Sequence, residues 1–246
     1  MMAIPYDFFE KNLENYTNKL ILANSCFTAN AVKEAIGVDS KVLYPPIPST
    51  FYTSENDYCK TGRDNLVVTT ARFGQGKGVE LIPVIASLTN PNTNFVLIGL
   101  AQDPNVVDNV KLIIKKLKLE NRVKIITNAS RKEIKNYLRK AKVYLHTTRM
   151  EHFGISIVEA MAMGCLPVVH DSGGTPEFVP DKYRYTTEYS AATIVEKAIY
   201  GWSEKESEIM RQIADRFSEA NFEKRFIELF SDYAFSWSSY NNSYSK

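Results

Sequence analysis

Short runs of β-branched and other apolar residues recur through the middle of the chain, separated by segments with helical spacing. Residues 106–117 and 131–141 repeat apolar side chains at helical intervals, and Ser130 with Glu133 has the form of a capping box. This alternation predicts an α/β fold, a Rossmann-like parallel sheet with helices on both faces. The predicted strands are NLVVTTA, NFVLIGL, RVKIIT, KVYLHTT and LPVVHDS.

The pattern differs on either side of this region. Residues 6–18 have helical spacing, residues 20–25 are predicted to form a strand, and a following helix ends at Gly37 before a Pro-rich segment. After Gly174 the chain is predicted to be mainly helical, with a long helical stretch from Ser203. We therefore divide the chain into residues 1–55, a remnant of another domain with a linker; 56–215, the sheet domain; and 216–246, a C-terminal helix and tail.

The net charge gives no reason to expect a nucleic-acid partner, and we expect none. The 246 residues carry a formal net charge of only +2, whereas binding to a phosphate backbone normally needs a concentrated basic surface. The basic run at residues 111–118 alternates with Leu and Ile at helical spacing, which is typical of a solvated helix face. Hydrophobic residues at 44% and charged residues at 24% indicate a folded globular protein.

Cysteines and histidines suggest neither disulfides nor metal. Cys26, Cys59 and Cys165 are far apart without a C-x-x-C motif, and the histidines lack metal-ligand spacing. The opening MMAIPYDFFEKNLENY lacks a basic region followed by an apolar core, and no run approaches the ~20 apolar residues of a membrane span. We expect a cytoplasmic protein whose membrane contact, if any, is peripheral.

A glycine-rich loop, ARFGQGKGVE, follows the first predicted strand of the sheet domain. It fits neither G-x-G-x-x-G nor a Walker A loop, because Gly78 follows Lys77 where the latter needs Ser or Thr. Arg72 and Lys77 nevertheless lie where a parallel strand ends and its helix begins, at the edge where such sheets bind ligands. Two cations there suit a diphosphate, although exposed surface cations would explain them equally well.

Two glutamates bracket the predicted start of a later helix. Glu151 and Glu159 would lie about 12 Å apart if the intervening chain were helical throughout. This is comparable with the span from ribose to hexose in a nucleotide-sugar, and backbone N–H groups near Phe153, Gly154 and Ile155 would attract a phosphate at the helix N-terminus. In the alternative interpretation, Glu151 only stabilises the helix N-terminus and Glu159 is an exposed helix residue. Ile155 is predicted to pack in the helix core.

Three motifs occur in a fixed order along the chain. R-x4-K lies at Arg72 and Lys77, E-x7-E at Glu151 and Glu159, and HDSGGTPE begins at His170. Over about residues 64–180 they resemble the C-terminal half of family 4 retaining glycosyltransferases of the GT-B fold. The string EHFGISIVEAMAMGCLPVVHDSGG is most similar to α-1,2-mannosyltransferases that extend lipid-linked oligosaccharides with GDP-mannose.

The resemblance implies roles for individual residues. Arg72 and Lys77 would hold the donor diphosphate and stabilise the leaving charge, with Glu151 on the transferred sugar; these three are the expected catalytic residues. Glu159 would bind the ribose, and residues 128–130 would border the base. The expected donor-binding set is Arg72, Lys77, Asn128, Ala129, Glu151, Phe153, Gly154, Ile155 and Glu159. The implied reaction is metal-independent glycosyl transfer with retention, and it needs no cofactor beyond the nucleotide-sugar.

The resemblance also implies partners. GDP-mannose is favoured over UDP-sugars as donor, and a glycan or lipid-linked acceptor is expected. Residues 1–55 resemble only the last part of an acceptor domain. Either the chain is a fragment of a longer enzyme or another polypeptide supplies the remainder, and we expect the isolated chain to bind donor without appreciable transfer. Apolar side chains at residues 221–233 would dock this partner, or else pack on residues 1–50 of the same chain.

Two other functional classes stay open at this point. One is a non-catalytic nucleotide-sugar-binding subunit or regulatory module, which would bind donor without turnover even with a partner present. The other is a phosphorylase-like or epimerase-like enzyme that uses the same donor geometry, which would release free sugar phosphate or an epimerised donor.

Overall fold

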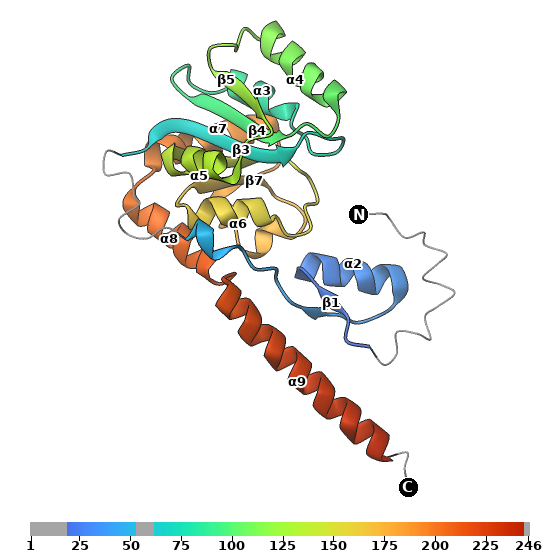
Figure 1. The fold of residues 1–246 in the computed structure, drawn as a ribbon. Helices are drawn as coiled ribbons and strands as arrows, with labels where there is room; N and C mark the ends of the chain where they lie inside the picture. Colours follow the sequence, from blue (N-terminus) through green and yellow to red (C-terminus); the bar gives the residue numbers. More distant parts are fainter. Residues whose placement is uncertain (1–18, 53–61, 244–246) are drawn as a thin grey trace. The chain divides into compact units, whose positions relative to one another are not determined.

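The computed structural model describes residues 19–52 and 62–243, with side chains up to Tyr233 in the last helix (Figure 1). The chain divides into two compact units. One combines Met1–Pro46 with Phe217–Lys246, and the other is Ile47–Arg216. The helix expected at residues 6–18 lies outside the described residues.

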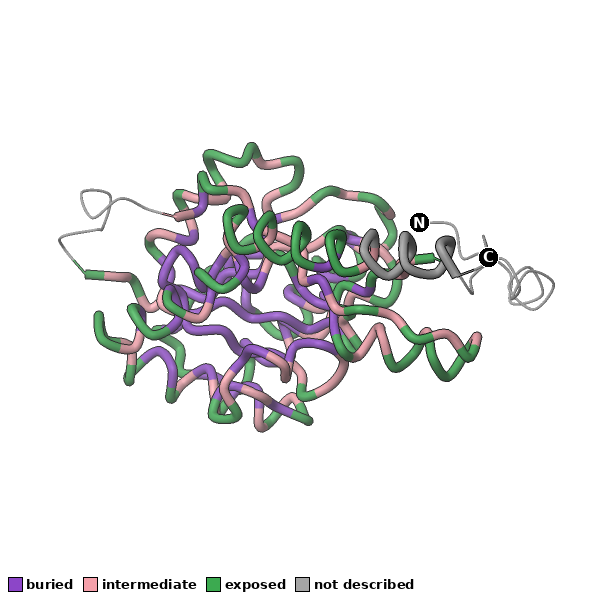
Figure 2. Tube along the Cα trace, turned by 90° about the horizontal axis from the view of Figure 1, so that it is seen from below, coloured by how far each residue is buried: buried purple, intermediate pink, exposed green. Residues whose placement is uncertain are grey.

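A six-stranded parallel sheet forms the core of the larger unit, in the order β5-β4-β3-β6-β7-β8. All five predicted strands are present, which confirms the α/β parallel sheet. The central residues of β3 and most residues of β4, β6 and β7 are buried, and the buried residues drawn purple in Figure 2 form the interior of the larger unit. The strands are β3 (Asp64–Arg72), β4 (Asn94–Leu100), β5 (Val123–Thr127), β6 (Ala141–His146), β7 (Leu166–His170) and β8 (Arg184–Tyr185).

Helices cover both faces of the sheet (Figure 1). On one face α3 packs against α4 and α7. On the other face α5 contacts β3 and β6, α6 contacts β6 and β7, and α8 contacts α6 and β7. The helices are α3 (Leu81–Ser87), α4 (Pro104–Lys116), α5 (Arg131–Lys140), α6 (Ile155–Ala162), α7 (Glu188–Gly201) and α8 (Glu204–Asp215). Short 3₁₀ turns lie at Ser49–Phe51, Thr175–Glu177 and Asp181–Tyr183.

Local sequence signals explain several of these boundaries. Ser130 accepts from the backbone of Glu133 while the Glu133 side chain reaches back to Ser130, so the predicted capping box starts α5. In α4, Val107 and Val110 are buried and the lysines of the basic run are mostly exposed. This confirms the solvated helix face and explains the run without a binding partner.

The strand order creates a switch point beside β3. The chain runs from β3 through β4 to β5 on one side, and then returns to β6 on the other side of β3. The connections that follow β3 and β6 therefore leave the sheet in opposite directions, which opens a crevice at the carboxyl ends of these two strands. Ligands of open α/β sheets bind at such a crevice.

Among its described residues, the smaller unit contains a two-stranded parallel sheet and two helices. A left-handed Gly37, with φ 70°, ends the first helix as predicted. The elements are β1 (Leu22–Ala23), α2 (Cys26–Ile36), β2 (Lys41–Val42) and α9 (Glu219–Ser243). The long helical stretch expected from Ser203 is thus two helices, α8 and α9, with a break between them.

The apolar stripe predicted on α9 has two different environments within this unit. Leu229 and Tyr233 line a small pocket together with Leu20 of the N-terminal segment, so this part packs on the same chain. Phe226 and Phe230 are 42% and 55% exposed, and their rings stack with centroids 6.2 Å apart. No helix among the described residues is long and apolar enough to cross a membrane.

Candidate functional site

The loop after β3 carries both predicted cations. Arg72 is the last residue of β3, and Lys77 follows in the glycine-rich loop. Both side chains line one open pocket of about 520 Å³. Its lining residues are Arg72, Gly74, Gln75, Lys77, Gln102, Asp103 and Pro104. The pocket therefore lies at the carboxyl end of the sheet, beside the switch point.

The loops after β3 and β6 are tied together at Lys77. The hydroxyl groups of Thr147 and Thr148 both donate to the Lys77 carbonyl oxygen, at 3.2 and 3.3 Å. Gly78 has φ 64°, and a Cβ at this position would lie 2.7 Å from the Thr147 carbonyl oxygen. Glycine is required there because any larger residue would push the two loops apart.

Glu151 lies in the loop after β6 with both carboxylate oxygens in contact with donors or cations. Oε2 is 3.3 Å from His146 Nε2 and 3.6 Å from Lys77 Nζ, and Oε1 accepts from the backbone N–H of His152 at 3.1 Å. His146 and then Lys77 lower the pKa of this carboxyl to about 2, against the opposing effect of burial. Glu151 is therefore a fixed, ionised acceptor beside a cation.

A third loop, after β7, supports the backbone of Glu151. Gly174 N–H donates to the Glu151 carbonyl oxygen at 2.8 Å, and Met150 N–H donates to Ser172 Oγ at 2.9 Å. His170 Nδ1 lies 2.8 Å from the same Ser172 hydroxyl. The HDSGG motif thus acts as a scaffold for the loop that carries the carboxylate.

The start of α6 lies between the two glutamates. The helix begins at Ile155 after a left-handed Gly154 with φ 96°, and no described side chain caps it. Its first N–H groups and its partial positive charge suit a phosphate. Because residues 151–154 are not helical, the separation of about 12 Å estimated for a continuous helix does not apply to Glu151 and Glu159.

Two of the predicted backbone contacts have contrasting side chains. Phe153 is 2% exposed and its ring packs 5.2 Å from that of Phe178, so only its backbone could meet a ligand. Ile155 was expected to pack in the helix core, and this was wrong, since its side chain is 45% exposed. As the first residue of α6, it lies before the stretch that packs on the sheet.

Glu159 and the turn after β5 make up the other end of the predicted site. Burial raises the pKa of Glu159 to about 7, and the charge of Arg131 opposes this shift. Arg131 is the first residue of α5, two positions after the predicted base-side residue Ala129. Asn128 is left-handed, with φ 59°, and its N–H donates to the Gly99 carbonyl oxygen at 2.8 Å.

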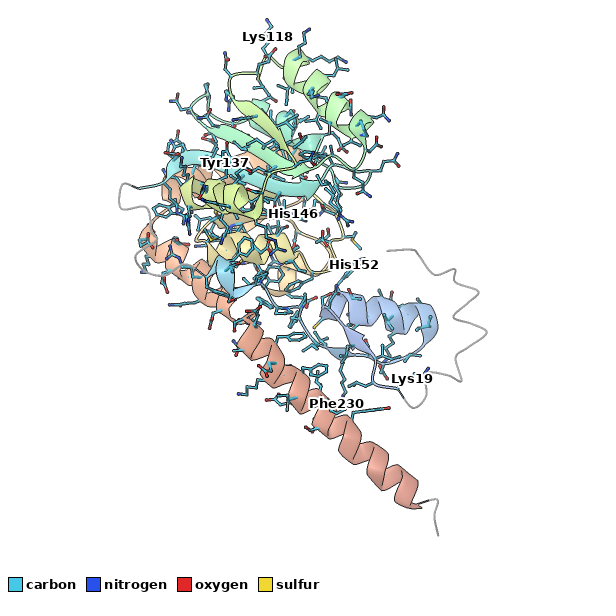
Figure 3. All side chains as sticks on the ribbon, in the orientation of Figure 1. Lys19, Lys118, Tyr137, His146, His152 and Phe230 are labelled. Atoms are coloured by element: carbon cyan, nitrogen blue, oxygen red, sulfur yellow. The ribbon has the colours of Figure 1, made fainter. Side chains whose placement is uncertain are left out.

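The structure brings the predicted catalytic residues to one crevice and adds neighbours that sequence reasoning missed. Gln102 and Asp103 line the cation pocket, although Asp103 also caps α4 by accepting from Asn105 N–H at 3.0 Å. They follow β4, which is parallel to β3, so their place at the same sheet edge could have been inferred. His146, labelled with His152 in Figure 3, ends β6 and gave no such signal.

The same fold is found in solved glycosyltransferase structures. Anabaena HepE in complex with UDP and glucose superposes with a TM-score of 0.80 at 23% identity, over 93% of this chain and 68% of that one. A Rickettsia africae glycosyltransferase gives 0.80 at 18% identity, over 95% and 69%. The fold and its switch-point loops define the chain as an α/β domain of the GT-B class. More specifically, residues 53–221 match the family Glycosyl transferases group 1, and the chain belongs to this family.

Curated relatives carry a more specific description. A Dictyostelium discoideum protein described as GDP-Man:Man(3)GlcNAc(2)-PP-Dol alpha-1,2-mannosyltransferase is 30% identical over 92% of this chain and 50% of its own length. The Homo sapiens protein of the same description is 30% identical over 85% of this chain and 47% of its own length. The chain thus spans about half the length of these relatives.

Proposed function

We propose that this chain is the donor-binding half of a retaining glycosyltransferase. The enzyme would transfer mannose, a hexose, from a nucleotide-sugar to a glycan or lipid-linked acceptor. One observation carries the proposal: Lys77 and Glu151 meet at the switch point, 3.6 Å apart. In a nucleotide-sugar the diphosphate is bonded directly to the anomeric carbon. A cation for the phosphate and a carboxylate for the sugar must therefore lie side by side.

Arg72 and Lys77 would stabilise the departing diphosphate. When the bond between the anomeric carbon and the phosphate oxygen breaks, negative charge accumulates on the leaving group. Two cations and the uncapped start of α6, fixed before the reaction begins, would offset that charge. This arrangement supports a reaction without a metal ion or other cofactor.

The remaining predicted residues would hold the rest of the donor. Glu151 would accept hydrogen bonds from sugar hydroxyl groups, because it is ionised and oriented by its neighbours. Glu159 would bind the ribose, and the turn at Asn128 and Ala129 would border the base. The effect of the Arg131 charge on the pKa of Glu159 supports this order, since Arg131 lies only two positions after Ala129 along the chain.

The relatives favour GDP-mannose as the donor. Their description includes GDP-mannose and a dolichol-linked oligosaccharide, and their similarity extends over nearly the whole chain. The solved structure that contains UDP and glucose is only 23% identical to this chain, so its similarity supports the fold and not the donor. A lipid-linked acceptor would bring the protein to the cytoplasmic face of a membrane as a peripheral protein, with the acceptor-binding surface supplied by further polypeptide.

The proposal is tested by following one labelled donor through binding and turnover. The purified chain is incubated with GDP-mannose, UDP-glucose or UDP-N-acetylglucosamine and a lipid-linked oligosaccharide acceptor. We expect saturable binding of GDP-mannose, displacement by GDP, recovery of intact donor and no appreciable transfer by the chain alone. Free sugar phosphate or an epimerised sugar would replace the proposed reaction with a phosphorylase-like or epimerase-like one. Failure to bind any of the three donors would contradict the proposal.

A further inference from the structure

His146 is a buried histidine directly beside the candidate site. It ends β6, pairs with Val169 of β7 in the sheet register, and is only 5% exposed. Its Nε2 atom lies 3.3 Å from Oε2 of Glu151, but the approach is not aligned as a hydrogen bond. Among the described residues Nε2 has no other partner. A buried ring nitrogen thus lies next to one oxygen of the proposed sugar-binding carboxylate, 3.3 Å from it.

The position of the His146 ring is fixed from the sheet side. It stacks on Tyr144 with ring centroids 6.5 Å apart and planes 18° apart. Tyr144 is itself fully buried, and its hydroxyl lies 2.9 Å from Thr70 Oγ1 on β3. The His146 carbonyl oxygen accepts from the Tyr185 hydroxyl at 3.1 Å. The histidine is therefore held by strands β3, β7 and β8 independently of Glu151.

Donor binding would change the partners of Glu151. Its Oε2 atom faces two groups, His146 Nε2 and Lys77 Nζ. If Lys77 turns toward a diphosphate, it leaves Oε2 of Glu151. Of these two contacts, Oε2 then keeps the one with His146. An ionised carboxylate can only accept, so Nε2 must carry the proton in this contact. Hydrogen bonds at active sites are often poorly aligned before substrate binds and tighten afterwards.

We propose that His146 is a positioning residue, which holds the Glu151 carboxylate in the orientation that binds the sugar of the donor. The inference rests on the proposed donor site and adds a specific role for a side chain behind it. His146 would not touch the donor. Its loss should therefore reduce the preference for a sugar-bearing donor and leave binding of the free nucleoside diphosphate unchanged.

The test compares the dissociation constants of GDP-mannose and GDP. In His146→Leu we expect GDP-mannose to bind about tenfold more weakly and GDP to change less than twofold. His146→Gln should recover most of the loss, because its amide nitrogen can take the place of Nε2, whereas the shorter His146→Asn should not. Melting temperatures show which variants fold, and the Gln and Asn pair carries the test if the Leu variant does not.

A double-mutant cycle isolates the action through Glu151. On a Glu151→Ala background, His146→Leu should have no further effect on GDP-mannose, because the carboxylate it positions is gone. The inference would be overturned if His146→Leu weakened GDP-mannose binding just as much on the Glu151→Ala background. It would also be overturned if the single variant His146→Leu lost equal affinity for GDP-mannose and GDP. If the unchanged protein bound neither ligand, the proposed function itself would fail and this inference with it.

Discussion

Lys77 Nζ lies 3.6 Å from Oε2 of Glu151, although the two residues come from loops that follow different strands. The order of strands brings them together, because β3 and β6 are neighbours at the switch point of the sheet. The same contact leaves a cation and a carboxylate adjacent at the mouth of a crevice. A ligand that joins an anionic group directly to a hydroxyl-rich one would satisfy both.

The two glutamates should be separable by ligand. Glu159→Ala should weaken GDP and GDP-mannose alike by about tenfold, since the loss of a hydrogen bond to a charged group costs about 1.5 kcal/mol or more. Glu151→Ala should weaken GDP-mannose by a similar factor and spare GDP, because it acts on the sugar. Isothermal titration of both ligands checks this. Equal effects of each variant on both ligands would refute the assignment.

Stability should depend on pH through Glu159. Burial raises the pKa of its carboxyl in the folded chain to about 7, above the ordinary value of 4.5. The folded state therefore holds the proton more tightly, and this contribution is complete below pH 4.5 and lost as pH rises through 7. Between pH 5 and 8, Glu159→Gln should gain about 2 kcal/mol relative to the unchanged protein.

Urea unfolding at several pH values measures this difference. The exposed Glu120→Gln serves as a matched control, and its difference from the unchanged protein should stay flat across the same range. A flat difference for Glu159→Gln as well would show that burial does not perturb this carboxyl in the folded protein.

Much of the fold could be predicted because its signals are local. Each of the five predicted strands is a short segment rich in β-branched and other apolar residues, and Ser130 and Gly37 fix helix ends through contacts within a few residues. The two-residue β8 gave no such signal, because only its pairing with β7 makes it a strand. The break after Arg216 contains neither Gly nor Pro, so periodicity alone could not place it.

The main residues of the candidate site could be predicted from the sequence, whereas the way in which they contact one another could not. Spacing and motif order singled out Arg72, Lys77 and Glu151, and the fold places them at one crevice. The His146 contact could not be foreseen, because it depends on how the loop after β6 folds back, with Met150 at φ 53° and Gly154 at φ 96°. Long-range loop geometry of this kind leaves little local trace in a sequence.

Gly173 should be essential to the loop that supports Glu151. It has φ 73°, and a Cβ there would lie 2.7 Å from the Glu151 backbone nitrogen. Gly173→Ala should therefore cost about 2 kcal/mol of stability and weaken GDP-mannose binding, because strain moves the carboxylate. Gly201→Ala is the control, since its Cβ would meet open space. We measure unfolding curves and GDP-mannose affinities for both variants. The same stability and affinity in Gly173→Ala and Gly201→Ala would contradict this role.

Arg63 should contribute to stability without affecting the site. It precedes β3 and donates to the carbonyl oxygens of Leu138 and Ala141 at 2.8 and 2.6 Å, at the sheet edge opposite the candidate site. Arg63→Met removes both of these charge-assisted hydrogen bonds and leaves the weaker Cys165 thiol as the side-chain donor to the two oxygens, so it should cost about 3 kcal/mol. Urea unfolding measures the loss, with the exposed Lys197→Met as control. Weakened GDP-mannose binding in a folded Arg63→Met would argue against a purely structural role.

The most direct test of the donor site is a calorimetric titration of GDP-mannose into three proteins: the unchanged chain, Lys77→Ala, and the remote Lys197→Ala. The account predicts one binding site in the unchanged chain, the same affinity in Lys197→Ala, and at least tenfold weaker binding in Lys77→Ala, because a desolvated charge-assisted contact to the diphosphate contributes about 1.5–3 kcal/mol. Binding of equal strength in all three proteins would contradict the central claim.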